Sequence, residues 1–124
     1  MNILPANQQK TFTTPNAVVV PLATPSLGSQ SLSVIRQRMA PQHQNPLHTQ
    51  THEEVMVMLS GKMSVQVAGE WAELHAGDTL TIPAATPHSL ENRSDIDAEW
   101  LIISPAGMQF HGPDGALMTP DWAR

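Results

Sequence analysis

Prolines and glycines interrupt this chain at short intervals along its whole length. The sequence holds 11 Pro and 7 Gly among its 124 residues. No long stretch between them shows the periodicity of an amphipathic helix, whereas short alternating runs of apolar and polar residues recur. Short strands separated by regular turn signals are typical of an all-β sandwich or barrel. We therefore expect an all-β protein.

The chain is long enough for one compact domain and too short for two of ordinary size. We expect an N-terminal arm over residues 1–15, a β-barrel over 16–104, and a C-terminal tail over 105–124. The tail carries too many apolar side chains for a free linker, so we expect it to pack on the barrel or on a second subunit. The predicted strands cover residues 16–22, 31–39, 55–59, 63–67, 71–75, 79–82, 88–92 and 98–104. Residues 40–46 hold two prolines, which predicts an irregular segment.

Composition argues against several kinds of partner. The formal net charge is −5, and the six basic residues are scattered, so a nucleic-acid surface is not expected. No apolar run approaches the length of a membrane span, and the first residues do not resemble a secretory signal, so the expected location is the cytoplasm. Because the chain has no cysteine, any metal must be held by histidine, carboxylate or amide groups.

Strand parity predicts which side chains point into the barrel. If Glu54 points inward, Met56 and Met58 do so too, and the opposite face of that strand carries Val55, Val57 and Leu59. A solvated strand would not present such an apolar face, so we expect a homodimer interface or a covering strand. If His88 points inward, so do Leu90 and Asn92, while Ser89, Glu91 and Arg93 face outward.

Two separate segments bring together groups that bind metals. His48, Gln50 and Glu54 lie within seven residues of one another, and His88 follows a later predicted strand. Two imidazoles and one carboxylate form the set typical of non-haem iron(II) with open positions. Gln50 would be a fourth donor through its amide oxygen, or would instead hydrogen-bond a bound water or substrate. His52 shares the parity of these residues on a regular strand and is an alternative ligand.

The same segments resemble the two motifs of the cupin superfamily. The motifs read G-x5-H-x-H-x3-E-x6-G and G-x5-P-x-G-x2-H-x3-N, and seven of their ten positions match here: His48, Glu54, Gly61, Gly77, Pro83, His88 and Asn92. The resemblance covers residues 42–92 directly. It implies a double-stranded β-helix, the jelly-roll barrel of cupins, and a metal site formed by His48, Gln50, Glu54 and His88.

Three positions depart from these motifs. Gln42 and Ala85 replace glycines at turns, and neither change threatens the fold. Gln50 replaces the second histidine of the first motif. Since an amide oxygen is a harder and weaker donor than imidazole, we expect lower affinity and a preference shifted from Zn and Cu towards Fe(II), Mn or Co. The expected cofactor is one divalent ion among Fe, Mn, Co, Ni and Zn.

The resemblance implies a fold more firmly than a reaction. Our first hypothesis is a mononuclear metal enzyme of the dioxygenase, isomerase or sugar-acid-modifying type, acting on a small organic molecule. The alternatives are a small-molecule-binding module without turnover, and a metal-free structural barrel that works through its dimer surface. No catalytic residue is assigned from the sequence, and no organic cofactor is expected.

Overall fold

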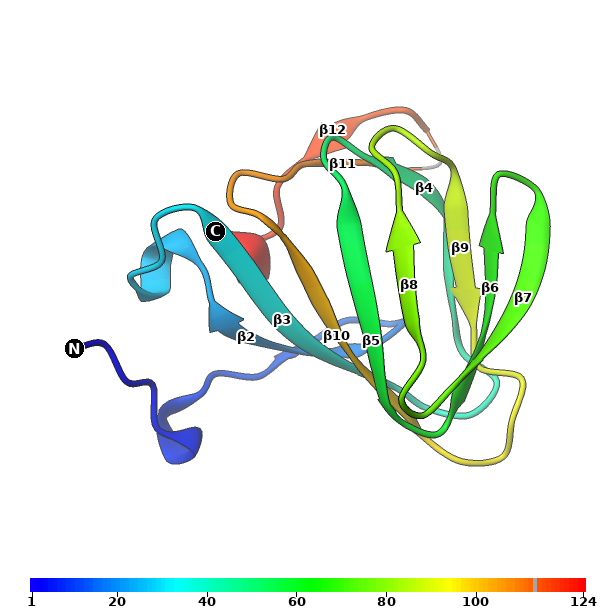
Figure 1. The fold of residues 1–124 in the computed structure, drawn as a ribbon, viewed down its shortest axis with the longest axis horizontal. Helices are drawn as coiled ribbons and strands as arrows, with labels where there is room; N and C mark the ends of the chain where they lie inside the picture. The colour runs from blue at the N-terminus through cyan, green and yellow to red at the C-terminus, as the bar shows by residue number, and fades with distance from the viewer. Residues whose placement is uncertain (113) are drawn as a thin grey trace.

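Two antiparallel β-sheets face each other across the core (Figure 1). The computed structural model describes residues 1–112 and 114–124. The first sheet has the strand order β1-β2-β3-β10-β5-β8, and the second has the order β12-β11-β4-β9-β6-β7. Consecutive strands therefore often lie in different sheets, as in a jelly roll, and the expected all-β barrel is confirmed.

The elements that the structure describes are short, as the spacing of prolines and glycines predicts. The strands are β1 (Phe12–Thr13), β2 (Val18–Ala23), β3 (Leu32–Met39), β4 (Gln44–Gln50), β5 (Glu54–Ser60), β6 (Lys62–Val67), β7 (Glu70–His75), β8 (Thr79–Ile82), β9 (His88–Glu91), β10 (Ala98–Pro105), β11 (Phe110–His111) and β12 (Leu117–Met118). Three single turns of 3-10 helix accompany them: η1 (Ala6–Gln8), η2 (Pro25–Leu27) and η3 (Asp121–Ala123). In the described residues, no helix is long and apolar enough to cross a membrane.

The expectation that residues 40–46 are irregular is wrong for its second half. Strand β4 begins at Gln44 and includes Pro46. The pairing of β4 with β9 is interrupted between Asn45 and His48, and β11 pairs with β4 only at Thr49 and Gln50. Pro46 thus lies where neither neighbour pairs with it, so its missing N–H leaves no gap in the ladder.

Inward-facing side chains of both sheets form one core. Its fully buried members include Ile35, Met39, Met56, Met58, Met63, Val65 and Trp100. The predicted parity of β5 is confirmed, because Glu54, Met56 and Met58 are buried while Val55 and Val57 are half-buried. Methionine suits such a barrel because its flexible side chain fills irregular gaps.

The parity predicted for β9 holds for His88, Leu90 and Asn92, all of which are buried. Ser89 is an exception, since it is buried as well. Its hydroxyl donates a hydrogen bond of 3.2 Å to Oε1 of Gln66 on β6, so the neighbouring strand covers it. The Asn92 amide donates to the carbonyl oxygens of Met39 and Ile96 at 3.0 and 2.8 Å, which joins the end of β9 to two other segments.

The two ends of the chain extend the sheets. Strand β1 pairs with β2 at the edge of the first sheet, and β11 pairs with both β4 and β12 in the second. Phe110 and Trp122 pack against the core cluster from this C-terminal segment. Figure 1 shows the red C-terminal turn behind β3, and η3 contacts β2. Both aromatic rings therefore border the space between the sheets.

Candidate functional site

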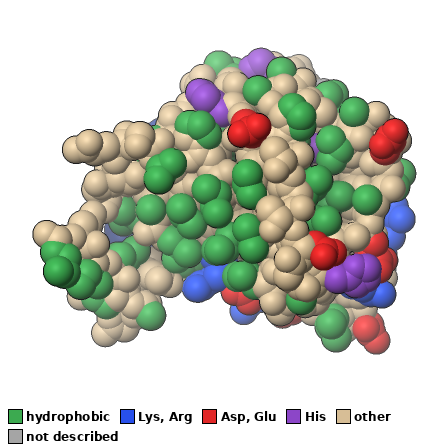
Figure 2. All heavy atoms as spheres, in the orientation of Figure 1, with side chains coloured by type: hydrophobic (Ala, Val, Ile, Leu, Met, Phe, Trp, Pro, Cys, Tyr) green, Lys and Arg blue, Asp and Glu red, His purple; other side chains and the backbone are tan. Residues whose placement is uncertain are grey.

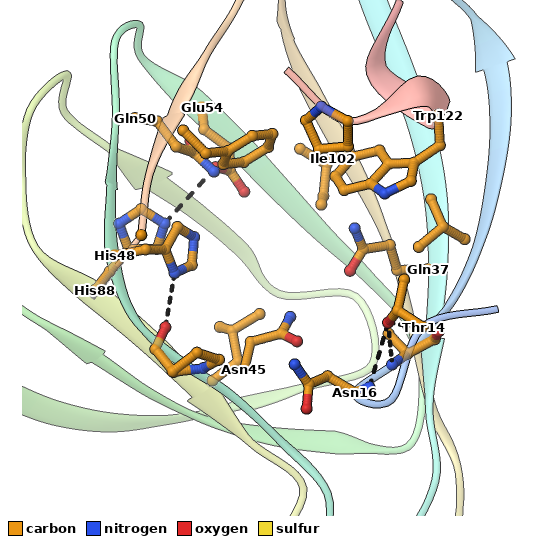
Figure 3. A pocket seen from close by; sticks show the side chains of 17 residues that line it. Thr14, Asn16, Gln37, Asn45, His48, Gln50, Glu54, His88, Ile102 and Trp122 are labelled. Atoms are coloured by element: carbon orange, nitrogen blue, oxygen red, sulfur yellow. Dashed lines mark hydrogen bonds and ion pairs between the residues drawn. The ribbon is translucent and has the colours of Figure 1, made fainter. Parts of the chain in front are cut away.

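Three strands bring the predicted site residues to one end of the space between the sheets. His48 and Gln50 lie on β4, Glu54 is the first residue of β5, and His88 is the first residue of β9. Pairing of β4 with β9 places His48 opposite His88. The structure separates Glu54 from the other two residues of the first motif by a bend over residues 51–53. Figure 3 shows the four side chains gathered on one side of a cavity.

Two pairs of side chains within this group lie at short range. The rings of His48 and His88 have centroids 4.2 Å apart and are inclined at 57°. Nε2 of His88 lies 3.9 Å from Oε2 of Glu54. That separation is too long for a hydrogen bond. It is shorter than the ~4.2 Å that two donors at ~2.1 Å from one metal ion could span.

Backbone carbonyl groups orient both imidazoles. Nδ1 of His48 donates to the carbonyl oxygen of Pro46, and Nδ1 of His88 donates to that of Thr86, each at 2.8 Å. Since a carbonyl oxygen only accepts, the proton of each neutral ring resides on Nδ1. Each Nε2 is thereby left with a free lone pair, the arrangement that metal-ligating histidines have.

Three acceptor atoms in this group are buried and have no hydrogen-bond partner among the residues that the structure describes. They are Oε1 of Gln50, Oε2 of Glu54 and Nε2 of His88. These side chains are 5%, 2% and 2% exposed, so solvent does not compensate them. Buried polar atoms are usually paired, and three unpaired acceptors close together call for an electropositive group. A divalent cation fits this donor set of imidazole, carboxylate and amide oxygen.

In their present positions, the side chains of this group do not surround a single point as a complete set of metal ligands. Among the residues that the structure describes, no group of three or more His, Cys, Asp or Glu side chains is arranged to hold a metal. Two imidazoles and one carboxylate come near one another in pairs, and Gln50 adds a fourth donor of a different kind. The fit of a cation thus rests on the chemistry and burial of these atoms.

Burial also sets the charge of the site. It raises the pKa of Glu54 to about 7, opposed by a hydrogen bond from the Gln50 side chain. It lowers the pKa of His88 to about 4, helped by repulsion from His48 and opposed by the hydrogen bond with Thr86. Burial lowers the pKa of His48 as well, against the hydrogen bond with Pro46. Both imidazoles are therefore neutral near pH 7, which is the form that binds metal.

The structure places His52 outside this group. It lies in the bend between β4 and β5, and its Nδ1 is 2.8 Å from the hydroxyl of the adjacent Thr51. The predicted parity of His52 with the site residues requires a continuous strand, and the bend over residues 51–53 breaks that continuity. His52 is not among the residues that line the cavity.

The cavity has a volume of about 230 Å³ and extends from the histidines towards the C-terminal segment. Its other wall carries neutral polar and aromatic side chains: Thr14, Asn16, Gln37, Asn45, Phe110 and Trp122. Sequence reasoning missed Gln37. The available signal was parity, because Gln37 alternates in step with Ile35 and Met39, whose side chains face the core.

A protein-family model and several solved structures are similar to this chain. The family model for the cupin domain matches residues 35–104. No curated protein matches the sequence. Among solved structures, the polyketide cyclase RemF from Streptomyces resistomycificus has a TM-score of 0.78 at 16% identity, covering 98% of this chain and 88% of its own.

Two further structures are similar. An RmlC-like cupin from Shewanella frigidimarina has a TM-score of 0.75 at 15% identity, covering 86% of this chain and 92% of its own. The oxalate decarboxylase of Lactobacillus farciminis has a TM-score of 0.74 at 20% identity over 81% of this chain. This chain spans only 32% of that enzyme's length. At such identities the likeness concerns the fold alone.

Proposed function

This chain belongs to the cupin family, and on that premise we propose that it is a mononuclear metal enzyme acting on a small organic molecule. The main support for this proposal is the set of three buried acceptors, on Gln50, Glu54 and His88, that have no partner among the described residues. His48 completes the set through its oriented Nε2. These four residues would hold one divalent ion, and the amide donor favours Fe, Mn or Co over Zn. Ni and Zn remain within the range of the donor set.

When bound, such an ion would supply Lewis acidity towards a carbonyl or hydroxyl oxygen of the substrate. The chain's own residues would orient the metal ligands and enclose the substrate. Pro46 and Thr86 fix the two imidazoles through their carbonyl groups. Glu54 is almost fully buried, so water competes little for its carboxylate and that group would be available to the ion.

Two of the similar structures are named as enzymes, a polyketide cyclase and an oxalate decarboxylase. These similarities support the proposal that the cavity is an active site, but they do not indicate which reaction takes place there. A binding module without turnover is the second candidate. The observation that favours it is the amide of Gln50 at a position where the first cupin motif has histidine, since a weaker donor reduces metal affinity.

Metal analysis tests the proposal directly. Protein loaded with Fe(II), Mn or Co and then dialysed should retain about one ion per chain by mass spectrometry. Glu54→Gln and His88→Ala should each retain less than about a tenth of that amount, because each removes a direct ligand. Glu53→Gln is the matched control, since Glu53 is the adjacent, exposed acid. Unchanged metal content in Glu54→Gln, or no retention by the native chain, would contradict the assignment.

We also propose that the chain forms a homodimer. Three half-buried side chains lie side by side across the outer face of the first sheet, because Ile103 on β10 pairs with Val34 on β3 and with Val55 on β5. Figure 2 shows hydrophobic side chains gathered over these strands, with charged groups at the margin. Arg36 and Glu99 form an ion pair of 3.3 Å on this face, so both signs of charge are present for a two-fold contact.

A further inference from the structure

Within the described part of the chain, the wall of the cavity carries no Lys or Arg side chain. None of the six Lys and Arg residues lines it; they are Lys10, Arg36, Arg38, Lys62, Arg93 and Arg124. Among the lining residues that the structure describes, Glu54 is the only acid. Proteins that recognise carboxylate or phosphate groups usually supply Arg or Lys to them. The part of a ligand that lies away from the histidines would therefore meet no counter-ion here.

Aromatic rings border the cavity from the histidines to its far end. The rings of His48 and Phe110 have centroids 6.0 Å apart, and those of Phe110 and Trp122 are 5.5 Å apart and inclined at 54°. Phe110 and Trp122 are half-buried, which leaves part of each ring facing the cavity. Aromatic pairs at such distances and inclinations stabilise one another beyond simple area burial. A flat aromatic ligand would extend this arrangement.

Gln37 supplies an unsatisfied polar atom on the wall opposite the histidines. Its side chain is 5% exposed, and no described residue forms a hydrogen bond with its Oε1. Figure 3 shows Gln37 across the cavity from His48 and His88, near Trp122. A buried amide oxygen in the core-facing row of β3 is costly unless a donor reaches it. The missing partner is a hydrogen-bond donor, and a ligand hydroxyl would provide one.

We propose that the cavity binds an aromatic molecule whose ring, at the end away from the histidines, carries a hydroxyl group and no charge. The ring packs against Phe110 and Trp122, and the hydroxyl donates a hydrogen bond to Oε1 of Gln37. The volume of about 230 Å³ limits the ligand to one or two fused rings, because pockets for drug-sized molecules begin at roughly 300 Å³. This assignment deepens the proposed function by naming a substrate class, and ring binding itself does not require the metal.

The test uses metal-free protein and two probes that share one ring system. We expect 2-naphthol to bind at least about ten-fold more tightly than 2-naphthoate by titration calorimetry, since the carboxylate finds no cation. Gln37→Met, an apolar side chain of similar shape, should weaken 2-naphthol binding about five-fold. Gln66→Leu is the matched control, because Gln66 lies on β6 and does not line the cavity.

Phe110→Leu provides a second arm that does not depend on the folding of Gln37→Met. It should weaken 2-naphthol binding about five-fold through loss of the ring contact. Equal or tighter binding of 2-naphthoate, or native affinity for 2-naphthol in both variants, would overturn the assignment. Metal retention is measured separately, so a chain that binds metal but not 2-naphthol would refute this substrate class and leave the proposed function standing.

Discussion

Nε2 of His88 and Oε2 of Glu54 face each other at 3.9 Å, and neither atom has a hydrogen-bond partner in residues 1–112 and 114–124. Both side chains are almost fully buried. Since the His88 ring is neutral near pH 7, the pair is not an ion pair there. In the metal-free protein, ionisation of Glu54 therefore places an uncompensated charge in the interior, which opposes folding.

This relationship predicts how stability changes with pH when metal is removed. The pKa of Glu54 is 4.5 in its ordinary state and about 7 in the fold, so the folded chain binds the proton more tightly. Stability from this group is fully present below pH 4.5 and is lost as pH rises through 7. Glu54→Gln lacks this loss. Its unfolding free energy relative to the native chain should rise by about 2 to 3 kcal/mol between pH 5 and pH 8.

Urea denaturation in the presence of a chelator measures that difference. His88 acts in the opposite direction, because its lowered pKa removes stability as pH falls from 6.5 towards about 4, but it is present in both proteins. Glu53→Gln, which replaces the adjacent exposed acid, is the matched control. A difference between Glu54→Gln and the native chain that stays constant from pH 5 to pH 8 would contradict the argument.

Ala85 occupies a backbone conformation that favours glycine, with φ of 58°. This is a position where the second cupin motif has glycine. Its N–H donates to the carbonyl oxygen of Gln50 at 2.8 Å, so the turn also supports the site. Ala85→Gly should raise the unfolding free energy by about 0.5 to 1 kcal/mol in urea denaturation, because it relieves left-handed strain.

Ala84→Gly is the matched control for this change. Ala84 is exposed in the same turn and has no positive φ, so glycine there should only loosen the unfolded chain and lower stability. Gln42 has a similar φ of 63°, but its amide donates to the carbonyl oxygen of Ser94 at 3.1 Å. Gln42→Gly should therefore gain less than Ala85→Gly. A loss of stability in Ala85→Gly would refute the strain argument.

Much of the barrel could be predicted from local pattern because its central strands alternate cleanly. The bounds of β8 match the predicted residues 79–82, and Met56 and Met58 point inward with Glu54 as expected. Strand β4 was harder to predict. Strand β4 forms by pairing with β9 and β11, which lie far along the chain and leave the position of Pro46 unpaired. The local sequence around Pro46 does not indicate these pairings.

The second wall of the cavity escaped prediction for a related reason. Phe110 lies on β11, a strand of two residues that pairs with β4 from about sixty positions away. So short a strand has no periodicity to detect. Gln37 was detectable in principle, since it occupies a core-facing position of β3, but an isolated polar residue in a core row does not by itself indicate which cavity it faces.

Gly61 ends β5 with φ of 71°, and a side chain there would collide with the backbone. An added Cβ would lie 2.3 Å from the carbonyl oxygen of Asp97 and 3.0 Å from Cα of Ala98. Gly61→Ala should lower the unfolding free energy by about 3 kcal/mol, from left-handed strain and overpacking together. Gly69→Ala separates the two causes, because Gly69 has φ of 85° and no atom near its added Cβ. It should lose only about 1 kcal/mol by urea denaturation. Equal losses would contradict the predicted collision.

The proposed homodimer makes a prediction about charge on the outer face of the first sheet. Ile103 lies in the middle of that face, between Val34 and Val55, and is half-buried. Light scattering should give the mass of a dimer for the native chain and of a monomer for Ile103→Glu, because a carboxylate at the centre of a two-fold contact meets its own copy. Ala76→Glu, in an exposed turn outside the sheets, should stay dimeric. A monomeric native chain would refute the dimer, and a dimeric Ile103→Glu would show that the contact lies on another face.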